Sequence, residues 1–539
     1  MNTPTHVSIA VALLLGLTVC SAWASGAWAP AQASSSNAPV AHPPHATNEP
    51  QRLSLTDFAR RLVYADELVR AQAMEQAIAG QSVRGAQAVY EPFLTTSLNR
   101  EGKFIPTTAE ESFSRPSGGT GQQVPYQAHI SQFKTGLGLK SSSGAEWEIA
   151  YNVDAIVNSL QSKVSPVVSP EYRGSLGFSV MQPLLRNFGA EVTEAGIRIA
   201  ESEEAIARET VRQVTAQRLS EGLQSYLLVQ RAQERVRWRQ HALDMASQLA
   251  TEMTRQQQAG LKSLNELTEA RANLALRQAQ LAQAEQDLQE QLNAMQVFLS
   301  AQPYSPVWGP REHAATRWLP SDPLQLPEAQ FADSLAMTDP QTAFERRPET
   351  RVNRLRIERE ALRREYALNQ TLPELTLRLR YGRDSLMDRP MPVSDYLDRT
   401  NTPYNTWGVG LTFRIGLGGD AKKDSEYQSA ILRKNQAELT LDAAQQRITN
   451  ELMGVKVVLQ RALQQARRQA DIVQAQSDLL AVERRMMGEG QKSLLDVLRR
   501  EMELALAHEA MGDVVMQVNR SSLVASQVNG GLLIRFGLE

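Results

Sequence analysis

Two stretches of the chain, 255–267 (RQQQAGLKSLNEL) and 485–497 (RMMGEGQKSLLDV), repeat one pattern about 230 residues apart. Each has a glycine, then Lys-Ser-Leu, then an acidic residue three positions after the serine. Glycine permits the positive φ that ends one helix, and the serine and the acid form a capping box that begins the next. The corresponding residues are Arg255, Gly260, Lys262, Ser263 and Glu266 in the first stretch and Arg485, Gly490, Lys492, Ser493 and Asp496 in the second. The pattern therefore predicts two sharp helical turns.

Long helices are predicted on both sides of each turn. The tracts 191–257 and 421–487 contain no proline and would each be of the order of 100 Å long. Return helices are predicted over 262–300 and 492–528. Their apolar residues recur every seventh position, as Leu267, Leu274, Leu281, Leu288 and Met295 and as Val497, Leu504, Met511 and Val518. A seven-residue period indicates coiled-coil packing.

Other segments show the two-residue alternation of strands. Before them, Ser54 and Asp57 cap a helix that is predicted to run to about Val89 and to stop at Pro92. Three predicted strands each turn their apolar residues to one face. These residues are Leu176, Phe178 and Val180; Leu375, Leu377 and Leu379; and Trp407, Val409, Leu411 and Phe413. Apolar residues on one face and arginines or small residues on the other suit a sheet between lipid and water, although a half-buried soluble sheet gives the same pattern.

The sequence consists of two tandem repeats, each made of a helix, strands and a helical hairpin. Pro92 corresponds to Pro373, and Gly260 to Gly490. The first copy carries about 50 more residues, nearly all between Pro92 and Pro183. This surplus is a Gly/Ser/Pro loop and an extra hairpin-like pair over 130–155. The sequence leaves open whether that hairpin widens the sheet or stands outside it.

These features predict six segments. They are a signal peptide (1–24), a disordered leader (25–52), a first repeat (53–300, with the extra hairpin within 104–171), an equatorial connector (301–345), a second repeat (346–530) and a C-terminal tail (531–539). The sole cysteine, Cys20, lies in the signal segment, and whether it is lipidated or removed stays open. No later run of about 18 apolar residues predicts a membrane-spanning helix.

Composition bounds the function. The 539 residues carry a formal net charge of -2, so no basic excess indicates nucleic-acid binding. The seven histidines are scattered, which predicts no metal site, and no nucleophile or phosphate-loop motif indicates an enzyme or a cofactor. Strands cross lipid only in a closed sheet, and one chain offers about four to six of them, so several copies must cooperate.

The order and duplication of these elements resemble the TolC-type outer-membrane efflux and secretion channels. The Gly-x-x-Ser-x-x-acid turns, QPLLRNFG at 182–189 and the stretch 345–382 (ERRPETRVNRLRIEREALRREYALNQTLPELTLRLRYG) carry the resemblance, which covers about 53–530. It implies an α+β membrane protein, a homotrimer whose strands close an outer-membrane β-barrel continued by a periplasmic α-barrel. It also implies a passive exit duct for a tripartite efflux pump or a type I secretion system. The partners would be a periplasmic adaptor, an inner-membrane RND, MFS or ABC transporter, and outer-membrane lipid.

In that family, acidic residues after the second turn line the periplasmic constriction. Asp496 stands at one such position, whereas the next is Arg499 rather than an acid. Asp496, Arg499 and Lys492 are therefore the predicted gate residues, and a negative ring of Asp496 side chains would attract cations. Asp496 and Arg499 could instead pair. The turn residues are also the predicted adaptor contact.

Two alternatives remain from the sequence. An enzyme would need catalytic signatures that the sequence does not present. A structural coiled-coil envelope or surface protein would explain the heptads but would leave the strands and the duplication unexplained. Conductance across a planar bilayer distinguishes a channel from a spacer. The exported substrate and the open or closed resting state are not readable from these residues.

Overall fold

The computed structural model describes residues 51–106, 126–158, 171–299, 318–327, 339–387, 404–417 and 419–538. The predicted signal segment, most of the leader and parts of the predicted connector lie outside this set. The chain divides into two compact units. The strand unit contains 87–195 and 366–424 among its residues, and the helical unit contains 44–86, 196–365 and 425–539.

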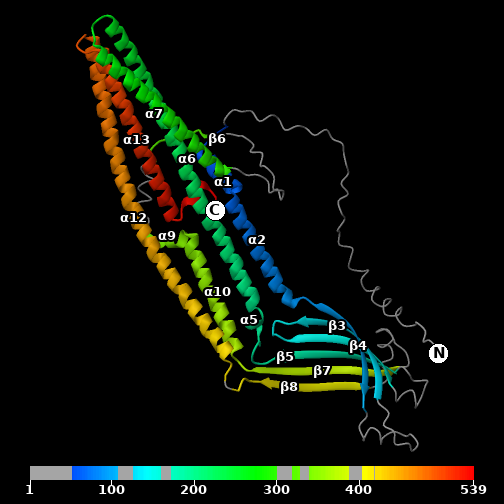
Figure 1. Ribbon diagram of the computed structural model, residues 1–539. Coiled ribbons are helices and arrows are strands. Elements are labelled where there is room, and N and C mark those ends of the chain that lie inside the picture. Colours follow the sequence, from blue (N-terminus) through cyan, green and yellow to red (C-terminus); the bar gives the residue numbers. More distant parts are fainter. Residues whose placement is uncertain are drawn as a thin grey trace, which may run out of the picture. The chain divides into compact units, whose positions relative to one another are not determined.

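The strand unit is built on one antiparallel sheet of six strands (Figure 1). The strands are β2 (Phe93–Ile105), β3 (Tyr126–Lys140), β4 (Glu146–Asn158), β5 (Glu171–Pro183), β7 (Glu374–Met387) and β8 (Asn405–Arg414). Their order in the sheet is β2-β3-β4-β5-β7-β8. The strands from the two halves of the chain therefore join directly, where β5 pairs with β7.

The helical unit is dominated by two long antiparallel hairpins (Figure 1). They are α6 (Ala195–Gln258) with α7 (Leu264–Gln296) and α12 (Ala421–Gly488) with α13 (Leu494–Val528). The shorter elements are α1 (Leu55–Ala65), α2 (Glu67–Gln87), α5 (Ala190–Thr193), α9 (Pro340–Arg346), α10 (Pro348–Gln370), α14 (Leu532–Phe536), the 3-10 turns η1 (Ala88–Tyr90) and η3 (Val297–Leu299), and the parallel strand pair β1 (Gln51–Leu53) and β6 (Trp318–Pro320). The two long hairpins confirm the prediction from the repeated turns.

The main apolar core lies where the middle of the α6–α7 hairpin meets the short elements. Side chains from α1, α6, α7, β6, α13 and α14 bury one another there. Phe58, Leu62, Leu219, Leu223 and Tyr226 are completely inaccessible to solvent. Burial of such side chains stabilises the fold by about 1.5–3 kcal/mol each. The heptad residues Leu267, Met295, Val497 and Val518 are also buried, as a coiled-coil seam requires.

The single helix predicted over 54–89 is wrong. Ser54 caps α1 as expected, accepting a hydrogen bond from the Asp57 amide at 3.2 Å. However, α1 ends at Ala65 because the Asp66 backbone is extended. The Asp66 carboxylate then accepts bonds from the Leu68 and Val69 amides at 3.0 and 3.1 Å and so begins α2. The helix predicted over 191–257 is likewise interrupted, at Glu194 between α5 and α6.

The extra hairpin belongs to the sheet. The sequence placed it at 130–155 and left its location open. In the structure β3 pairs with β2, and β4 pairs with β5. The hairpin therefore lies between β2 and β5, which would be neighbours if the first repeat had no inserted hairpin.

Candidate functional site: the two helical turns and the apolar sheet face

Both helical turns end their first helix in the same way. Gly260 and Gly490 have φ angles of 74° and 76°. The Gly260 amide donates to Gln257 at 2.9 Å and the Leu261 amide donates to Gln256 at 2.9 Å. At the second turn the Gly490 amide donates to the Met487 carbonyl oxygen at 3.0 Å, and the Gln491 amide donates to the Met486 carbonyl oxygen at 2.8 Å. This pair of bonds is a Schellman motif, which the left-handed glycine makes possible.

Both turns begin their second helix with the predicted capping box. Ser263 Oγ accepts from the Glu266 amide at 3.3 Å, and Glu266 Oε2 accepts from the Ser263 amide at 2.9 Å. Ser493 and Asp496 repeat this exchange at 3.3 and 3.1 Å. The capping prediction is therefore confirmed at both turns. Figure 1 shows that the turns lie at the same end of the helical unit.

The two acidic side chains differ in their partners. Lys262 Nζ lies 2.8 Å from Glu266 Oε1. This bond, followed by the bonds from Ser263, lowers the pKa of Glu266 to about 2. The pKa of Asp496 is also lowered, first by the Ser493 hydroxyl and amide and only then by the charges of Lys492 and Arg499. Among the residues described, the Asp496 carboxylate thus makes only the capping bonds to Ser493, whereas the longer Glu266 side chain makes the capping bonds to Ser263 and an ion pair with Lys262.

The suggested pairing of Asp496 with Arg499 is not observed within the part of the second turn that the structure covers. Arg485, Lys492 and Arg499 are exposed and make no ion pair with the described residues. At the first turn, by contrast, Arg255 pairs with Glu252 at 3.1 Å and Lys262 pairs with Glu266. The two turns have the same backbone conformation but different ion pairs. The repeated sequence pattern did not reveal this difference.

A small apolar cluster ties the two hairpins together just behind the turns. Leu249, Ala250 and Met253 of α6 and Leu267 and Ala270 of α7 bury Leu498 of α13. Because Leu498 lies two residues after Asp496, this packing positions the capping carboxylate. At the turns themselves, Leu261 is 75% exposed and Leu264 is 66% exposed, so the first turn presents apolar surface that we did not predict.

The pKa of Glu266 makes the first turn sensitive to acid. A carboxyl whose pKa falls from 4.5 in an unfolded chain to about 2 stabilises the folded turn fully above pH 4.5. The stabilisation is lost as the pH falls through about 2. Lys262→Ala removes the largest cause and is expected to raise the pKa of Glu266, as measured by carboxyl ¹³C titration.

The matched variant is Lys492→Ala at the second turn. Lys492 is only a secondary cause of the lowered pKa of Asp496, so this variant is expected to shift the Asp496 titration less. A larger shift at Asp496 than at Glu266 would contradict the assignment of the lysine contact.

The sheet brings the predicted strand residues together on one face. Phe178 of β5 pairs with Tyr381, which pairs with Trp407 of β8. Val180, Leu379 and Val409 form a parallel row, and Leu377 with Leu411 and Leu375 with Phe413 extend the face. Leu176 lies on the same face opposite Arg383. Trp407, Val409, Leu411 and Phe413 are all more than half exposed, which makes this an apolar surface without a cover from the described chain.

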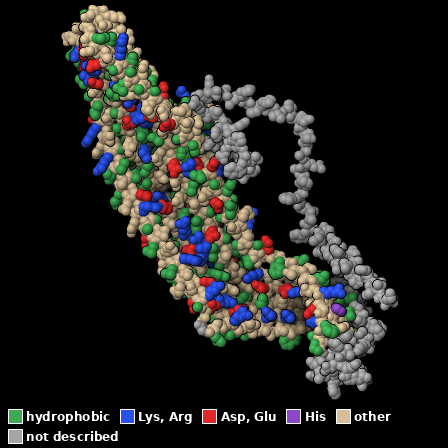
Figure 2. Space-filling view, viewed as in Figure 1, with side chains coloured by type: hydrophobic (Ala, Val, Ile, Leu, Met, Phe, Trp, Pro, Cys, Tyr) green, Lys and Arg blue, Asp and Glu red, His purple; other side chains and the backbone are tan. Residues whose placement is uncertain are grey.

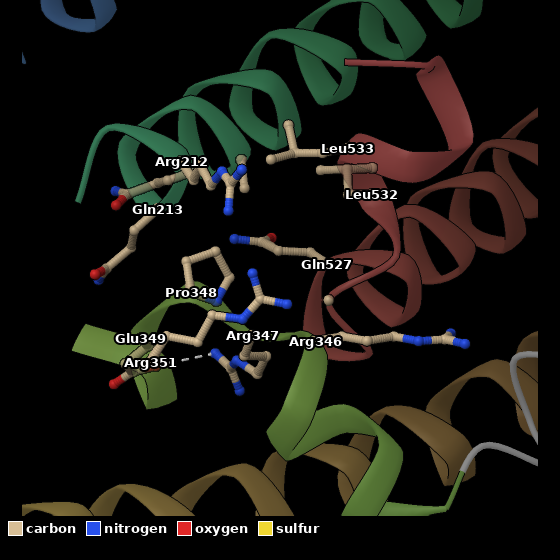
Figure 3. Close-up of a pocket in the computed structure, with 13 residues that line it drawn as sticks. Arg212, Gln213, Arg346, Arg347, Pro348, Glu349, Arg351, Gln527, Leu532 and Leu533 are labelled. Atoms are coloured by element: carbon tan, nitrogen blue, oxygen red, sulfur yellow. Dashed lines mark ion pairs between the residues drawn. The ribbon is translucent and has the colours of Figure 1, made fainter. Parts of the chain in front are cut away.

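A cavity of 430 Å³ in the helical unit is lined by residues of α6, α9, α10, α13 and α14 and by Gly530 between the last two helices (Figure 3). Four arginines line it, but three of them already meet acids. Arg347 lies 2.9 Å from Glu451, and Glu209 lies 2.8 Å from Arg212 and 3.8 Å from Arg351. These ion pairs neutralise most of the positive charge of the arginines. We therefore interpret the cavity as a packing gap between helices and not as a binding site.

Within the covered residues, no group of three acidic, histidine or cysteine side chains is arranged to hold a metal ion. No helix among them is long and apolar enough to cross a membrane. Lys, Arg, Asp and Glu side chains are interspersed along the visible face of the helical unit (Figure 2).

Comparisons with known proteins agree with this architecture. Residues 152–300 match the family model described as outer membrane efflux protein. No curated protein matches the chain. Among solved structures, CusC is similar with a TM-score of 0.57 at 15% identity, covering 89% of this chain and 92% of that one.

Two further channels have the same fold. The VceC outer membrane protein of Vibrio cholerae has a TM-score of 0.58 at 15% identity, covering 88% of this chain and 96% of its own. The CmeC outer membrane channel of Campylobacter jejuni has a TM-score of 0.56 at 15% identity, covering 89% and 86%. The matching family is one of channel proteins rather than enzymes. Residues 152–300 thus match the outer membrane efflux protein family model, and the chain as a whole has the fold of the TolC-type outer-membrane channels.

Proposed function

We propose that the protein is the outer-membrane exit duct of a tripartite efflux pump or a type I secretion system. Three copies would form one passive conduit from the periplasm to the cell exterior. An adaptor protein would join it to an inner-membrane RND, MFS or ABC transporter. One observation supports the proposal: each unit of the chain exposes sheet edges or apolar side chains that a second copy of the same chain could cover.

The first such surface is the sheet. Its edge strands β2 and β8 each have one strand neighbour among the described residues, and its apolar face is exposed. Unpaired backbone N–H and C=O groups are costly in lipid, so a sheet that enters a membrane must close. Joining β8 of one copy to β2 of the next would satisfy both edges.

The second surface lies on α12. Leu432, Leu439 and Met453 are at least 60% exposed and are separated by one or two heptads. Ile472 and Leu479, which are seven residues apart from each other, are further exposed apolar positions on the same helix. A heptad stripe that the described residues of its own chain leave exposed favours packing against a helix of another copy.

The two turns are proposed as the periplasmic end. Asp496, Lys492 and Arg499 would line the constriction of the trimer. The other turn residues, Arg255, Gly260, Lys262, Ser263, Glu266, Arg485, Gly490 and Ser493, would face the adaptor. The exposed Leu261 and Leu264 offer that partner an apolar contact, and Arg485, which is exposed and makes no ion pair among the described residues, favours acidic groups on it.

The function is tested with the purified full chain in a planar lipid bilayer. We expect a trimer in detergent and a stable ionic current after reconstitution. A monomer that stays soluble without detergent and passes no current would instead indicate a structural envelope protein and would overturn the proposal.

The charge at the constriction gives a separate prediction. At a narrow opening each Asp496 carboxylate favours cations over anions, and the cations Lys492 and Arg499 oppose that effect. Asp496→Asn is expected to lower the cation-to-anion permeability ratio by about two- to fivefold, measured as the reversal potential in a salt gradient. Asparagine can still accept the Ser493 amide bond, so the cap is largely kept.

The matched variant is Arg499→Gln, one helical turn away. Removal of this exposed cation is expected to raise the same permeability ratio. If neither variant changes the reversal potential while both channels conduct, the second turn does not line the conduction path.

A further inference from the structure

The β3–β4 hairpin is an integral part of the sheet. β3 pairs with β2 continuously from Phe93 opposite Gly138 to Ile105 opposite Tyr126. β4 pairs with β5 from Glu146 opposite Met181 to Ile156 opposite Glu171. The hairpin thus separates β2 from β5 along their whole lengths.

The hairpin is also fixed at its turn. Gly144 has a φ of 85°, and a Cβ there would lie 2.4 Å from the Asn187 carbonyl oxygen. Ser143 accepts hydrogen bonds at its carbonyl oxygen from Gln182 Nε2 and from the Gly189 amide, both at 3.1 Å. The end of β5 and the segment that follows it therefore hold the turn in place.

One apolar row crosses all six strands. Leu94, Leu137, Ile149, Phe178, Tyr381 and Trp407 are successive partners in the register. Two of the six belong to the hairpin, Leu137 and Ile149, and they are 47% and 52% exposed. The hairpin thus presents apolar side chains on the same face as the strands of the repeat, in line with them.

The neighbouring register row, on the opposite face, consists of small residues. It runs Thr95, Gly136, Ala150, Gly177, Gly382 and Thr406. A Cβ on Gly136 would meet Ala150 Cβ at 3.1 Å and the Ile149 carbonyl oxygen at 3.2 Å. Small side chains on one face allow a sheet to curl toward that face. The row continues through the hairpin without interruption, so the hairpin shares this feature as well.

The number of strands also permits closure. Every adjacent pair in the sheet is antiparallel, so the two edge strands β2 and β8 run in opposite directions. The β8 edge of one copy can therefore pair with the β2 edge of the next in the same antiparallel pattern. An inserted hairpin preserves this property, whereas a single inserted strand would not.

We infer that the β3–β4 hairpin is part of the channel wall and sets the width of the outer-membrane end. The inference rests on the proposed trimer. Three copies of the six-stranded sheet supply about 18 strands, and three copies without the hairpin would supply about 12. Because the diameter of a barrel grows roughly linearly with its strand number, the hairpin widens the lumen about 1.5-fold.

The wider end admits bulkier hydrated solutes than the repeat alone would accommodate. The lumen would be lined by the polar face of the hairpin, where Lys134 Nζ lies 2.7 Å from Glu148 and Asn152 donates to Ser175 at 3.2 Å. These pairs are neutral overall, so the hairpin acts on the size of the cargo more than on its charge.

The test removes the hairpin and measures the width of the opening. Deletion of 126–158 joins residue 125 directly to residue 159, and β2 and β5, which run antiparallel, can then pair with each other. The full chain and the deletion variant are compared in planar bilayers with neutral polyethylene glycols of graded radius, added to one side at a time. On the more accessible side, the full chain is expected to admit polymers with radii about 1.5-fold larger.

The outcomes separate this inference from the proposed function. If both proteins are trimers that conduct with the same polymer cut-off, the hairpin does not lie in the wall. If the full chain is neither trimeric nor conducting, the proposed function fails, and the location of the hairpin is then decided by labelling.

Single cysteines decide that location without any deletion, and they serve equally if the deletion variant does not fold. In a Cys20→Ala background, Ile149→Cys and Glu148→Cys probe the two faces of β4, and Phe178→Cys and Ser179→Cys probe their register partners on β5. In lipid, we expect a charged thiol reagent to modify Glu148→Cys and Ser179→Cys, and to modify the other two about tenfold more slowly or less. Rapid modification of Ile149→Cys while Phe178→Cys stays protected would place the hairpin outside the wall.

Discussion

Asp66→Ala is expected to destabilise the helical unit by about 3 kcal/mol or more, because it removes two interactions at once. The Asp66 side chain is only 2% exposed. Its Oδ2 accepts bonds from Arg218 Nε at 3.0 Å and Nη2 at 2.7 Å, and its Oδ1 caps α2. Without Asp66, the largely buried Arg218 keeps only Glu221, at 2.6 Å, as an acidic partner, and α2 loses its capping carboxylate. The free energy of unfolding, followed by helical circular dichroism in denaturant, measures the loss.

Two variants divide this effect. Asp66→Asn keeps an oxygen for the helix cap but loses the charge that faces Arg218, so it isolates the ion pair. Asp57→Ala removes an exposed aspartate from the preceding helix and is expected to cost about 0.5–1 kcal/mol, as the loss of a capping contact does. If Asp66→Ala costs no more than Asp57→Ala, the buried pair does not anchor α2.

Gly222→Ala is expected to destabilise the same unit by about 1–3 kcal/mol, although alanine favours helices. A Cβ on Gly222 of α6 would lie 2.1 Å from Leu62 Cδ1 and 3.4 Å from Phe298 Cδ1. Leu62 is completely buried, so it has little room to move. The glycine therefore lets α1 pack directly on α6.

The matched variant is Gly196→Ala on the same helix, where a Cβ meets nothing within 4 Å. There the same substitution is expected to stabilise by up to about 1 kcal/mol, from helix propensity alone. A Gly222→Ala/Leu62→Ala double variant should lose less than the sum of the two single losses, because the smaller side chain relieves the clash. Stabilisation by Gly222→Ala alone would contradict the close contact.

The elements that depend on local periodicity were predictable. The left-handed glycines and the Ser-x-x-acid boxes are determined by residues within one turn of each other, so Gly260, Ser263, Gly490 and Ser493 could be placed from the sequence. Alternation likewise assigned Phe178, Leu379 and Trp407 to one face. The break at Asp66 was missed, because aspartate is also tolerated inside helices; in the structure its carboxylate caps α2 and also accepts a bond from Arg218, 152 residues away.

The sequence by itself determined the duplication, the two helical turns and the strand faces, because these follow from short-range stereochemistry and from periods of two and seven. Its motifs, in their order, also carried the resemblance to outer-membrane channels. Only the tertiary structure decided where the β3–β4 hairpin lies and which charges are paired. Register and ion pairing depend on side chains that are distant in the chain and meet only after folding. Two examples are the pair of Arg231 and Asp513, 2.6 Å apart between α6 and α13, and Arg499, which has no ion pair among the described residues although it lies near the capped Asp496.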